Sequence, residues 1–396
     1  MRGPTPFNRS VLLMAQTPHP VSGAPGPRRG PVLYHLADVR LGGTFPFLGE
    51  AGAAHRRQIR ETFVRAVDAG VDLRPTVVLI TGNLFGTPVP SRELIEFARA
   101  QVGRFTSQGI PVLIAAGPFD PLHERSYALG AFTGLEHVTV FPAAPRAVDV
   151  ADGAVRVVGI SWSGAPVSVD FLTALARHPR RPYLVGAGCL ALPDGEEGLA
   201  ALRRLVDGSG AHYLALGHSP VRRDVGSERV TALFPGAPEL VAPVEGEGSP
   251  VLVEFQGDRA RPTFVPVGRR RFQRLDVNAA ACAGTDDLAA AIRALGSPDL
   301  AAVVRLTGTL RLDQHFDLDH VLARARDAFL ALELEDETVM AAAELAAARF
   351  PDLSAAGAFV TVARQELDRA QSPDARRIAG AALRLGLALL EGRRVP

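Results

Sequence analysis

The sequence predicts an α/β protein whose main domain is a two-sheet sandwich flanked by helices. The first observation is a shared pattern: branched apolar residues run into a polar, glycine-bearing turn at Val32–Gly43, Val77–Gly86 and Val112–Asp120. Buried parallel strands end in this way where the edge of a sheet faces a ligand. The second observation is that amphipathic helical segments separate these strands. The third is a later run of short alternating strands, which is typical of a second sheet.

Residues 31–120 read as strand, helix, strand, helix, strand. The first helix is expected at His55–Gly70, with Gly70 ending it, and the second at Arg92–Gln108, with Ser91 as its N-cap. Right-handed crossovers then make the three strands a parallel sheet with helices against it. Asp38, Arg40, Asn83 and Asp120 follow the strand ends, so we expect them to lie close together.

The second sheet is expected to begin with the short strands between Val138 and Ile160. Helices are predicted at Val169–Arg177 and Glu197–Gly208, and the strand Tyr213–His218 ends in Gly-His. Further strands with Pro and Gly turns between them are expected at Tyr183–Val185, Val230–Phe234, Val251–Phe255 and Thr263–Val267. The sandwich thus accounts for residues 31–268.

Three other regions complete the expected domain organisation. Residues 1–30 are interpreted as a disordered N-terminal tail. Residues 269–335 form a small α+β capping unit, entered through the junction Gly268–Arg274 and containing a helix at 286–295, a strand at 301–312 and a helix at 318–330. Residues 336–396 form a helical C-terminal region, helical from Glu337 on, with its main helices at Ala358–Ala370 and Ala375–Leu390.

Composition excludes several classes of protein. Hydrophobic residues make up 47% and charged residues 21%, no apolar run is long enough for a membrane span, and the net charge is only +1. The chain contains no lysine, which excludes a Walker-type phosphate loop and a Schiff-base lysine. Cys189 and Cys282 match neither a disulfide framework nor a zinc site, which favours a reducing cytoplasm.

Five motifs in order resemble the calcineurin-like metallophosphoesterases: HLADVRLGG, LITGNLFG, AAGPFDPL, YLALGH and FPGAPE. Within that superfamily the chain is most similar to the DNA-repair exonuclease branch, the SbcD-like and YhaO-like nuclease subunits that work with a coiled-coil ATPase. The resemblance covers roughly residues 31 to 275. It implies the metallophosphoesterase fold and a centre of two divalent ions about 4 Å apart.

The metal-binding positions of that family are largely replaced here. Asp38 remains in the first motif, but Arg40 stands where the family has histidine. Asn83 and Gly86 replace acidic residues of the second motif. In the third motif, the family's Gly-Asn-His-Asp reads Gly117, Pro118, Phe119, Asp120, so its amide ligand and its histidine are both missing. A further histidine would fall near Gly186 or Ala187. The last motif keeps His218 but has Ser219 and Pro220 after it.

Asp38 and His218 are therefore the residual ligands, one for each ion. Divalent cations such as Mn²⁺ take about six donors, so we expect no cofactor; Mn²⁺ would be expected only of an active enzyme. Two roles remain open for Arg40. It forms an ion pair that neutralises Asp38, which we favour, or it binds a phosphate.

Three functions follow from these residues. The leading one is a catalytically inactive SbcD-like subunit that scaffolds or regulates DNA repair or processing in the cytoplasm, with an SMC-like ATPase and as a homodimer. The second is an active metal-dependent exonuclease or phosphoesterase with substituted ligands. The third is a module that binds DNA ends or nucleotides through Arg40 and the basic patch Arg269, Arg270, Arg271 and Arg274.

Other polar residues have simpler interpretations. We expect His35 to be a hydrogen-bonded core residue and Asp120 to cap a turn. Asp313, His315, Asp317, Asp319 and His320 resemble metal ligands, but acids at the start of the helix from Leu318 favour its dipole. The arginine patch at 269–274 is interpreted equally well as a solvated linker.

Overall fold

A computed structural model describes residues 30–122, 129–132, 134–164, 167, 170–179, 183–311, 314–340, 354–372, 375, 378–380, 382, 383 and 386. Within these residues two six-stranded sheets face each other. The first has the order β12, β11, β1, β2, β3, β4. Its strands are Arg259–Phe264, Val251–Gln256, Val32–Leu36, Val77–Thr81, Val112–Ala115 and Val138–Val140. The second has the order β5, β6, β7, β8, β10, β9, with strands Arg146–Val150, Val155–Ile160, Tyr183–Cys189, Tyr213–Gly217, Thr231–Phe234 and Arg223–Asp224.

The predicted α/β sandwich is confirmed. β1, β2, β3 and β4 are parallel neighbours, and the hairpin of β11 and β12 joins β1 in antiparallel register. β4 was expected to open the second sheet, but Val112 of β3 pairs with Val138 of β4, so it belongs to the first. The apolar side chains that face each other between the sheets include Leu33, Leu79 and Tyr213.

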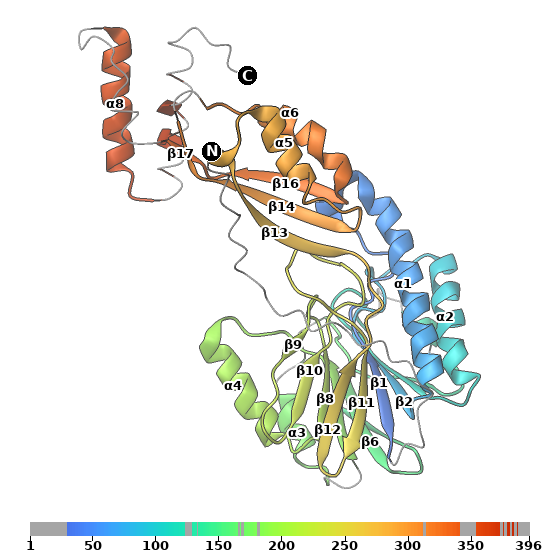
Figure 1. Cartoon of the computed structure of the whole chain (residues 1–396). Coiled ribbons are helices and arrows are strands. Elements are labelled where there is room, and N and C mark those ends of the chain that lie inside the picture. The colour runs from blue at the N-terminus through green and yellow to red at the C-terminus, as the bar shows by residue number, and fades with distance from the viewer. Residues whose placement is uncertain are drawn as a thin grey trace, which may run out of the picture.

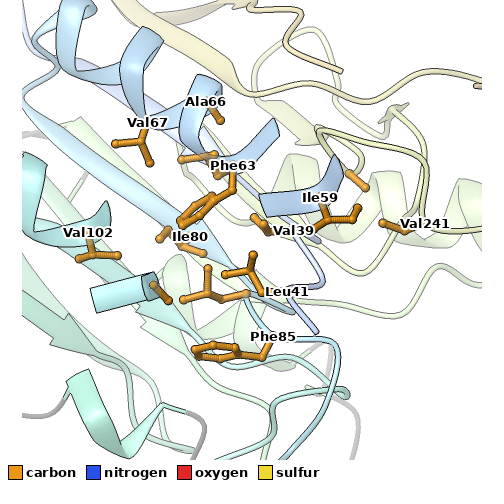
Figure 2. Close-up of a cluster of buried hydrophobic side chains, with 14 of the residues drawn as sticks. Val39, Leu41, Ile59, Phe63, Ala66, Val67, Ile80, Phe85, Val102 and Val241 are labelled. Atoms are coloured by element: carbon orange, nitrogen blue, oxygen red, sulfur yellow. The ribbon is translucent and has the colours of Figure 1, made fainter. Parts of the chain in front are cut away.

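Helices cover the outer faces of both sheets (Figure 1). α1 (Gly52–Leu73) and α2 (Arg92–Thr106) lie on the first sheet, and α3 (Asp170–Leu175) and α4 (Gly195–Gly208) lie on the second. Figure 2 shows the cluster beneath α1 and α2, where Phe63, Ile80 and Phe85 pack together. As predicted, the side chain of Ser91 caps α2 by accepting from the amide of Leu94.

Gly70 does not end α1, contrary to expectation, because the helix continues to Leu73. A Cβ at Gly70 would lie 2.6 Å from the ring of Tyr34 and 2.8 Å from that of Phe105. Glycine is therefore required at this position for close packing of the helix on β1 and α2, and the left-handed Arg74 ends the helix instead.

A third sheet follows the sandwich. β13 (Arg271–Asn278), β14 (Leu300–Thr307) and β16 (Ala331–Asp336) are parallel, with α5 (Thr285–Arg293) and α6 (Leu318–Ala325) as crossovers; we call these elements the three-stranded unit. Two predicted elements are shorter than expected. The strand from 301 is interrupted at Gly308, which has φ +110, and resumes as β15 (Thr309–Leu310). α6 ends at Ala325 and gives way to a 3-10 turn.

The chain is not helical from Glu337 on. Val339–Met340 form β17, which pairs with β15, because the amide of Val339 donates to the carbonyl of Gly308 at 3.0 Å. α8 (Ala355–Arg369) corresponds to the first expected C-terminal helix, and most of the second lies outside the described residues. The expected N-terminal tail also lies outside them, apart from Gly30. No helix among the described residues is long and apolar enough to cross a membrane.

Candidate functional site

The ends of β1, β2, β3 and β8 meet at one edge of the sandwich. Backbone hydrogen bonds join the first two: the amide of Asp38 donates to the carbonyl of Gly82 at 3.0 Å, and that of Arg40 to the carbonyl of Asn83 at 2.8 Å. Asp38, Arg40, Asn83 and His218 all have positive φ, between 53° and 95°, so the backbone turns sharply here. The edge thus brings together the five predicted site residues, Asp120 included, and we call these five the strand-end cluster.

Asp38 is fully engaged by its neighbours. The side-chain amide of Asn83 donates to its Oδ1 at 2.6 Å, and the backbone amide of His218 donates to its Oδ2 at 2.8 Å. The side chain is only 1% exposed. Burial raises the pKa of Asp38 to about 6, although both hydrogen bonds act in the opposite direction. Asn83 therefore serves as a donor to Asp38.

Asp120 holds the strand ends together. Its Oδ1 accepts from the amides of Asn83 (3.1 Å) and Gly117 (2.8 Å), and its Oδ2 from the amide of Phe85 (3.0 Å). The side chain is completely buried, and burial raises its pKa to about 7. Asp120 thus caps its own turn and also ties that turn to the end of β2.

Arg40 does not form the expected ion pair with Asp38. Among the described residues no carboxylate lies within 4.0 Å of its guanidinium; the guanidinium carbon instead lies 3.3 Å from the centre of the Phe119 ring. The oxygens of Asp38 instead accept hydrogen bonds from Asn83 and His218. Its Nε is buried without a described hydrogen-bond partner. Burial lowers the pKa of Arg40, while Asp38 and Asp120 raise it.

His218 lies against an aromatic residue that the sequence did not single out. The rings of His218 and Trp162 are 5.6 Å apart at an angle of 43°. Burial and the nearby charge of Arg40 lower the pKa of His218, so the ring is neutral at pH 7. Its Nδ1 is buried and has no hydrogen-bond partner among the described residues.

Cys189 is a second residue that the sequence reasoning missed. β7 extends to Cys189, so Gly186 and Ala187, where a family histidine was placed, lie inside the strand and not at its end. The buried sulfur lies 2.6 Å from the position that a Cβ of Gly82 would take. Burial raises the pKa of this thiol. The signal was available, because the apolar run from Tyr183 continues to Leu190.

These residues do not fit a two-metal centre. Every oxygen of both carboxylates accepts at least one internal N–H, and the Oδ1 of Asn83 accepts from the amide of Phe119 at 3.0 Å. In the described part of the chain no three His, Cys, Asp or Glu side chains are grouped to hold a metal ion. The fixed positive charge of Arg40 also opposes a cation at this edge.

The acidic motif near α6 has structural partners. Asp317 caps α6 by accepting from the amide of His320 at 3.0 Å, and His320 Nε2 lies 3.1 Å from Asp286 of α5. Asp313 lies outside the described residues. His35 is, as expected, a buried core residue: its two ring nitrogens lie 2.8 Å from the Tyr213 hydroxyl and 2.6 Å from that of Thr81.

The arginine patch is not a solvated linker. β13 begins at Arg271, and Phe272 is buried in the main core. Arg270 contacts His55, and Arg274 pairs with Glu335 at 3.3 Å, whereas Arg269 and Arg271 are exposed. The sequence could not reveal this, because a four-arginine run looks like a linker unless Phe272 is recognised as core. None of the described contacts of these arginines reaches the strand-end cluster.

Comparison with known proteins identifies a relative. The chain is 30% identical over 274 residues to the DNA double-strand break repair protein Mre11 of Aeropyrum pernix, which covers 63% of this chain. The predicted relationship is confirmed. The chain is similar to this DNA-repair protein, as its resemblance to the DNA-repair branch of the metallophosphoesterases predicts. It spans 64% of the length of that relative.

Two further comparisons add little to this relationship. No family model matches the chain. Among solved structures, the crystal structure of TT1561 of Thermus thermophilus covers 59% of this chain and 99% of its own, with 12% identity and a TM-score of 0.36. A similarity of that degree supports no inference about fold or function.

Proposed function

We propose that this protein is a catalytically inactive relative of metallophosphoesterase nucleases that scaffolds or regulates a DNA-repair or DNA-processing assembly. The observation that carries the proposal is the state of the two buried carboxylates. Each oxygen of Asp38 and Asp120 accepts at least one N–H from the protein itself. Each of these oxygens already accepts a protein N–H, so a cation bound here would compete with the protein's own donors for the same carboxylates.

The remaining side chains do not supply phosphodiester hydrolysis by another route. A two-metal site activates water and stabilises the leaving group with its ions. Here the position next to Asp38 is taken by an amide, and Arg40 is stacked on Phe119. His218 Nδ1 is buried without a hydrogen-bond partner in the part of the chain that the structure describes, so no described carboxylate orients this nitrogen for general acid–base catalysis.

The proposed partner is an SMC-like coiled-coil ATPase, and the proposed setting is a cytoplasmic homodimer. The relative is a DNA double-strand break repair protein. α8 buries Val360 but leaves Val362 59% exposed, and Ile378 beyond it is 64% exposed. Exposed apolar residues on a helix are suited to packing against a partner helix.

The decisive test combines metal binding with nuclease assays. Calorimetric titration with Mn²⁺ and digestion of single- and double-stranded DNA in the same buffer would be done on the wild type and on the Asp38→Ala, His218→Ala double variant. We expect neither Mn²⁺ binding nor cleavage in either protein. Stoichiometric Mn²⁺ binding with cleavage that the double variant abolishes would show instead that the protein is an active metal-dependent nuclease.

A second candidate function is the binding of an unpaired terminal nucleotide of DNA without hydrolysis. Nε of Arg40 is buried without a hydrogen-bond partner among the described residues, and half-buried Trp162 lies next to His218 at the same edge. A cation beside aromatic rings suits a phosphate and a stacked base.

The single tryptophan makes this second candidate directly testable. Fluorescence of Trp162 would be followed in EDTA during titration with a short oligothymidine, with and without a 5′-phosphate. We expect phosphate-dependent quenching that Arg40→Gln abolishes and Arg99→Gln, on the exposed face of α2, does not. Binding that is lost only in the Arg269→Gln, Arg271→Gln variant would assign any DNA contact to the exposed arginines instead.

A further inference from the structure

Glu239, from the FPGAPE motif, is buried where α1 meets the chain that enters the three-stranded unit, and it is not part of the strand-end cluster. Its side chain is 1% exposed and accepts five hydrogen bonds. Two come from α1, namely from Gln58 Nε2 (3.1 Å) and the Thr62 hydroxyl (2.7 Å). A buried carboxylate is tolerated only when it is bonded this completely.

One donor is the amide of the neighbouring Leu240, and the other two lie on the chain that enters the three-stranded unit. The backbone amides of Arg269 and Arg270 donate to Glu239 at 3.2 and 2.8 Å, immediately before β13 begins at Arg271. Gly268 passes so close that a Cβ there would lie 2.4 Å from the carbonyl oxygen of Pro238. One carboxylate therefore fixes the start of β13 relative to α1.

His55 provides a second tie between the same two elements. The ring is completely buried; its Nε2 lies 2.5 Å from the carbonyl oxygen of Leu240, and its Nδ1 lies 2.8 Å from an Nη of Arg270. A carbonyl accepts and a guanidinium donates, so the ring is the neutral Nε2–H tautomer. Arg270 also reaches Asp299, before β14, at 3.8 Å.

Two other directional bonds lie near this junction: the amide of Arg274 in β13 donates to Glu245 at 2.8 Å, and Nε of Arg65 on α1 donates to the carbonyl of Val267 at 2.9 Å. The remaining contacts between the unit and the sandwich are less directional. Phe272, Ala301 and Val303 join the apolar cluster that contains Leu240 and Val241, and an exposed pair links Arg326 to Glu50 at 3.9 Å. Apolar contact supplies adhesion but tolerates sliding and rotation. An exposed ion pair at this separation contributes little.

We propose that Glu239, His55 and Arg270 form a latch that sets the orientation of the three-stranded unit on α1. With the latch closed, the unit and the sandwich move as one body. With the latch open, the unit rotates about residues 267–270 while its apolar face stays in contact. The latch governs only the movement of the three-stranded unit and does not depend on whether the strand-end cluster is catalytic.

The test is a distance measurement between spin labels on the two parts. Labels would be placed by Arg99→Cys on α2 and Asp319→Cys on α6, both exposed, in a Cys282→Ser background; Cys189 is buried. Double electron–electron resonance would be recorded for this protein and for the same protein with Glu239→Gln, Arg270→Gln or Arg274→Gln. Arg274→Gln is the matched control, because it removes only an exposed pair with Glu335 in the same unit.

We expect a single narrow distribution of label-to-label distances for the labelled parent and for Arg274→Gln. For Glu239→Gln and Arg270→Gln we expect this distribution to become broad. Circular dichroism would verify that each variant is folded. If Glu239→Gln does not fold, Arg270→Gln decides, since it leaves all five bonds to Glu239 in place. A narrow, parent-like distance in Arg270→Gln would overturn the proposal and assign the orientation to the apolar contact alone.

Discussion

The side-chain amide of Asn83 donates to Oδ1 of Asp38 at 2.6 Å, in the place where the metallophosphoesterase resemblance implies a second carboxylate. This bond converts two strand ends that would otherwise need a cation between them into a pair that holds itself together. Asp38, Asn83 and Asp120 therefore form a buried, internally hydrogen-bonded network. We expect substitutions in this network to change the stability of the fold before anything else.

Asn83→Asp is expected to destabilise the fold, because it places two buried carboxylates in contact. The loss should be about 3 kcal/mol at pH 8, typical of an uncompensated buried charge. Two adjacent carboxylates share a proton, so their pKa is raised above the unfolded value; the penalty is full above that pKa and is relieved as the pH falls. Urea unfolding at pH 8 and pH 5.5 measures both effects.

The control for this substitution is Asn278→Asp. Asn278 caps an exposed 3-10 turn by accepting from the amide of Ala280, and aspartate caps equally well. Equal stability losses in the two variants would contradict the proposed role of Asn83. Recovery of Asn83→Asp stability with Mn²⁺ would show that the edge still accepts a cation once the carboxylate is restored.

Asp120→Asn is expected to cost about 3 kcal/mol, because asparagine offers one acceptor oxygen to three buried backbone amides and leaves at least one unsatisfied. Chemical denaturation measures the change. Asp224→Asn is the control: Asp224 accepts from the amide of Gly226 in an exposed turn. If the two variants lost similar, small amounts of stability, Asp120 would not hold the strand ends together.

Gly86→Ala is expected to destabilise the protein by more than about 2 kcal/mol, since its Cβ would lie 2.4 Å from the Cα of Gly43, a backbone atom that cannot move freely. The same contact prevents an acidic residue from being restored at this position. Gly103→Ala in α2 meets nothing within 4 Å and should stabilise by about 0.5–1 kcal/mol. Thermal unfolding of the pair checks both signs.

His35 predicts the acid sensitivity of the sandwich. Burial lowers its pKa from 6.5 to about 3, so the unfolded chain binds a proton that the folded protein does not. Its contribution to stability is complete above pH 6.5 and is lost as the pH falls toward 3, with a slope of up to about 1.4 kcal/mol per pH unit. His35→Gln should reduce the slope of unfolding free energy against pH in this range by about one proton relative to the wild type.

Much of the fold and the location of the site could be predicted from the sequence because both depend on local patterns. Apolar runs that end in glycine-bearing turns placed Asp38, Asn83 and Asp120 at one edge, and alternating strands predicted the second sheet. The partners of each side chain could not be predicted in the same way. The sequence predicts that Arg40 pairs with Asp38, the nearest carboxylate. In the structure Asp38 accepts hydrogen bonds from residues that follow β2 and β8, and the Arg40 guanidinium packs on the Phe119 ring.

Long-range packing explains the other differences. The role of Gly70 depends on Tyr34, and that of the arginine run depends on Phe272 being buried against the sandwich. The role of Glu239 depends on donors from α1 and from residues 269 and 270, which its position in the FPGAPE motif does not reveal. Such contacts join residues that are about 30 to 200 positions apart, beyond the reach of any local pattern.

Four non-glycine residues at the strand ends keep left-handed backbone conformations, each of which costs about 1 kcal/mol. Backbone bonds such as Asp38 to Gly82 and Arg40 to Asn83 help to maintain this shape, together with the three backbone amides that the Asp120 side chain accepts from. The curvature of the edge therefore depends on Asp120 and on the absence of a side chain at Gly86, and much less on what Arg40 carries. For protein design, a new ligand at this edge is best introduced at Arg40, with Asp120 and Gly86 kept.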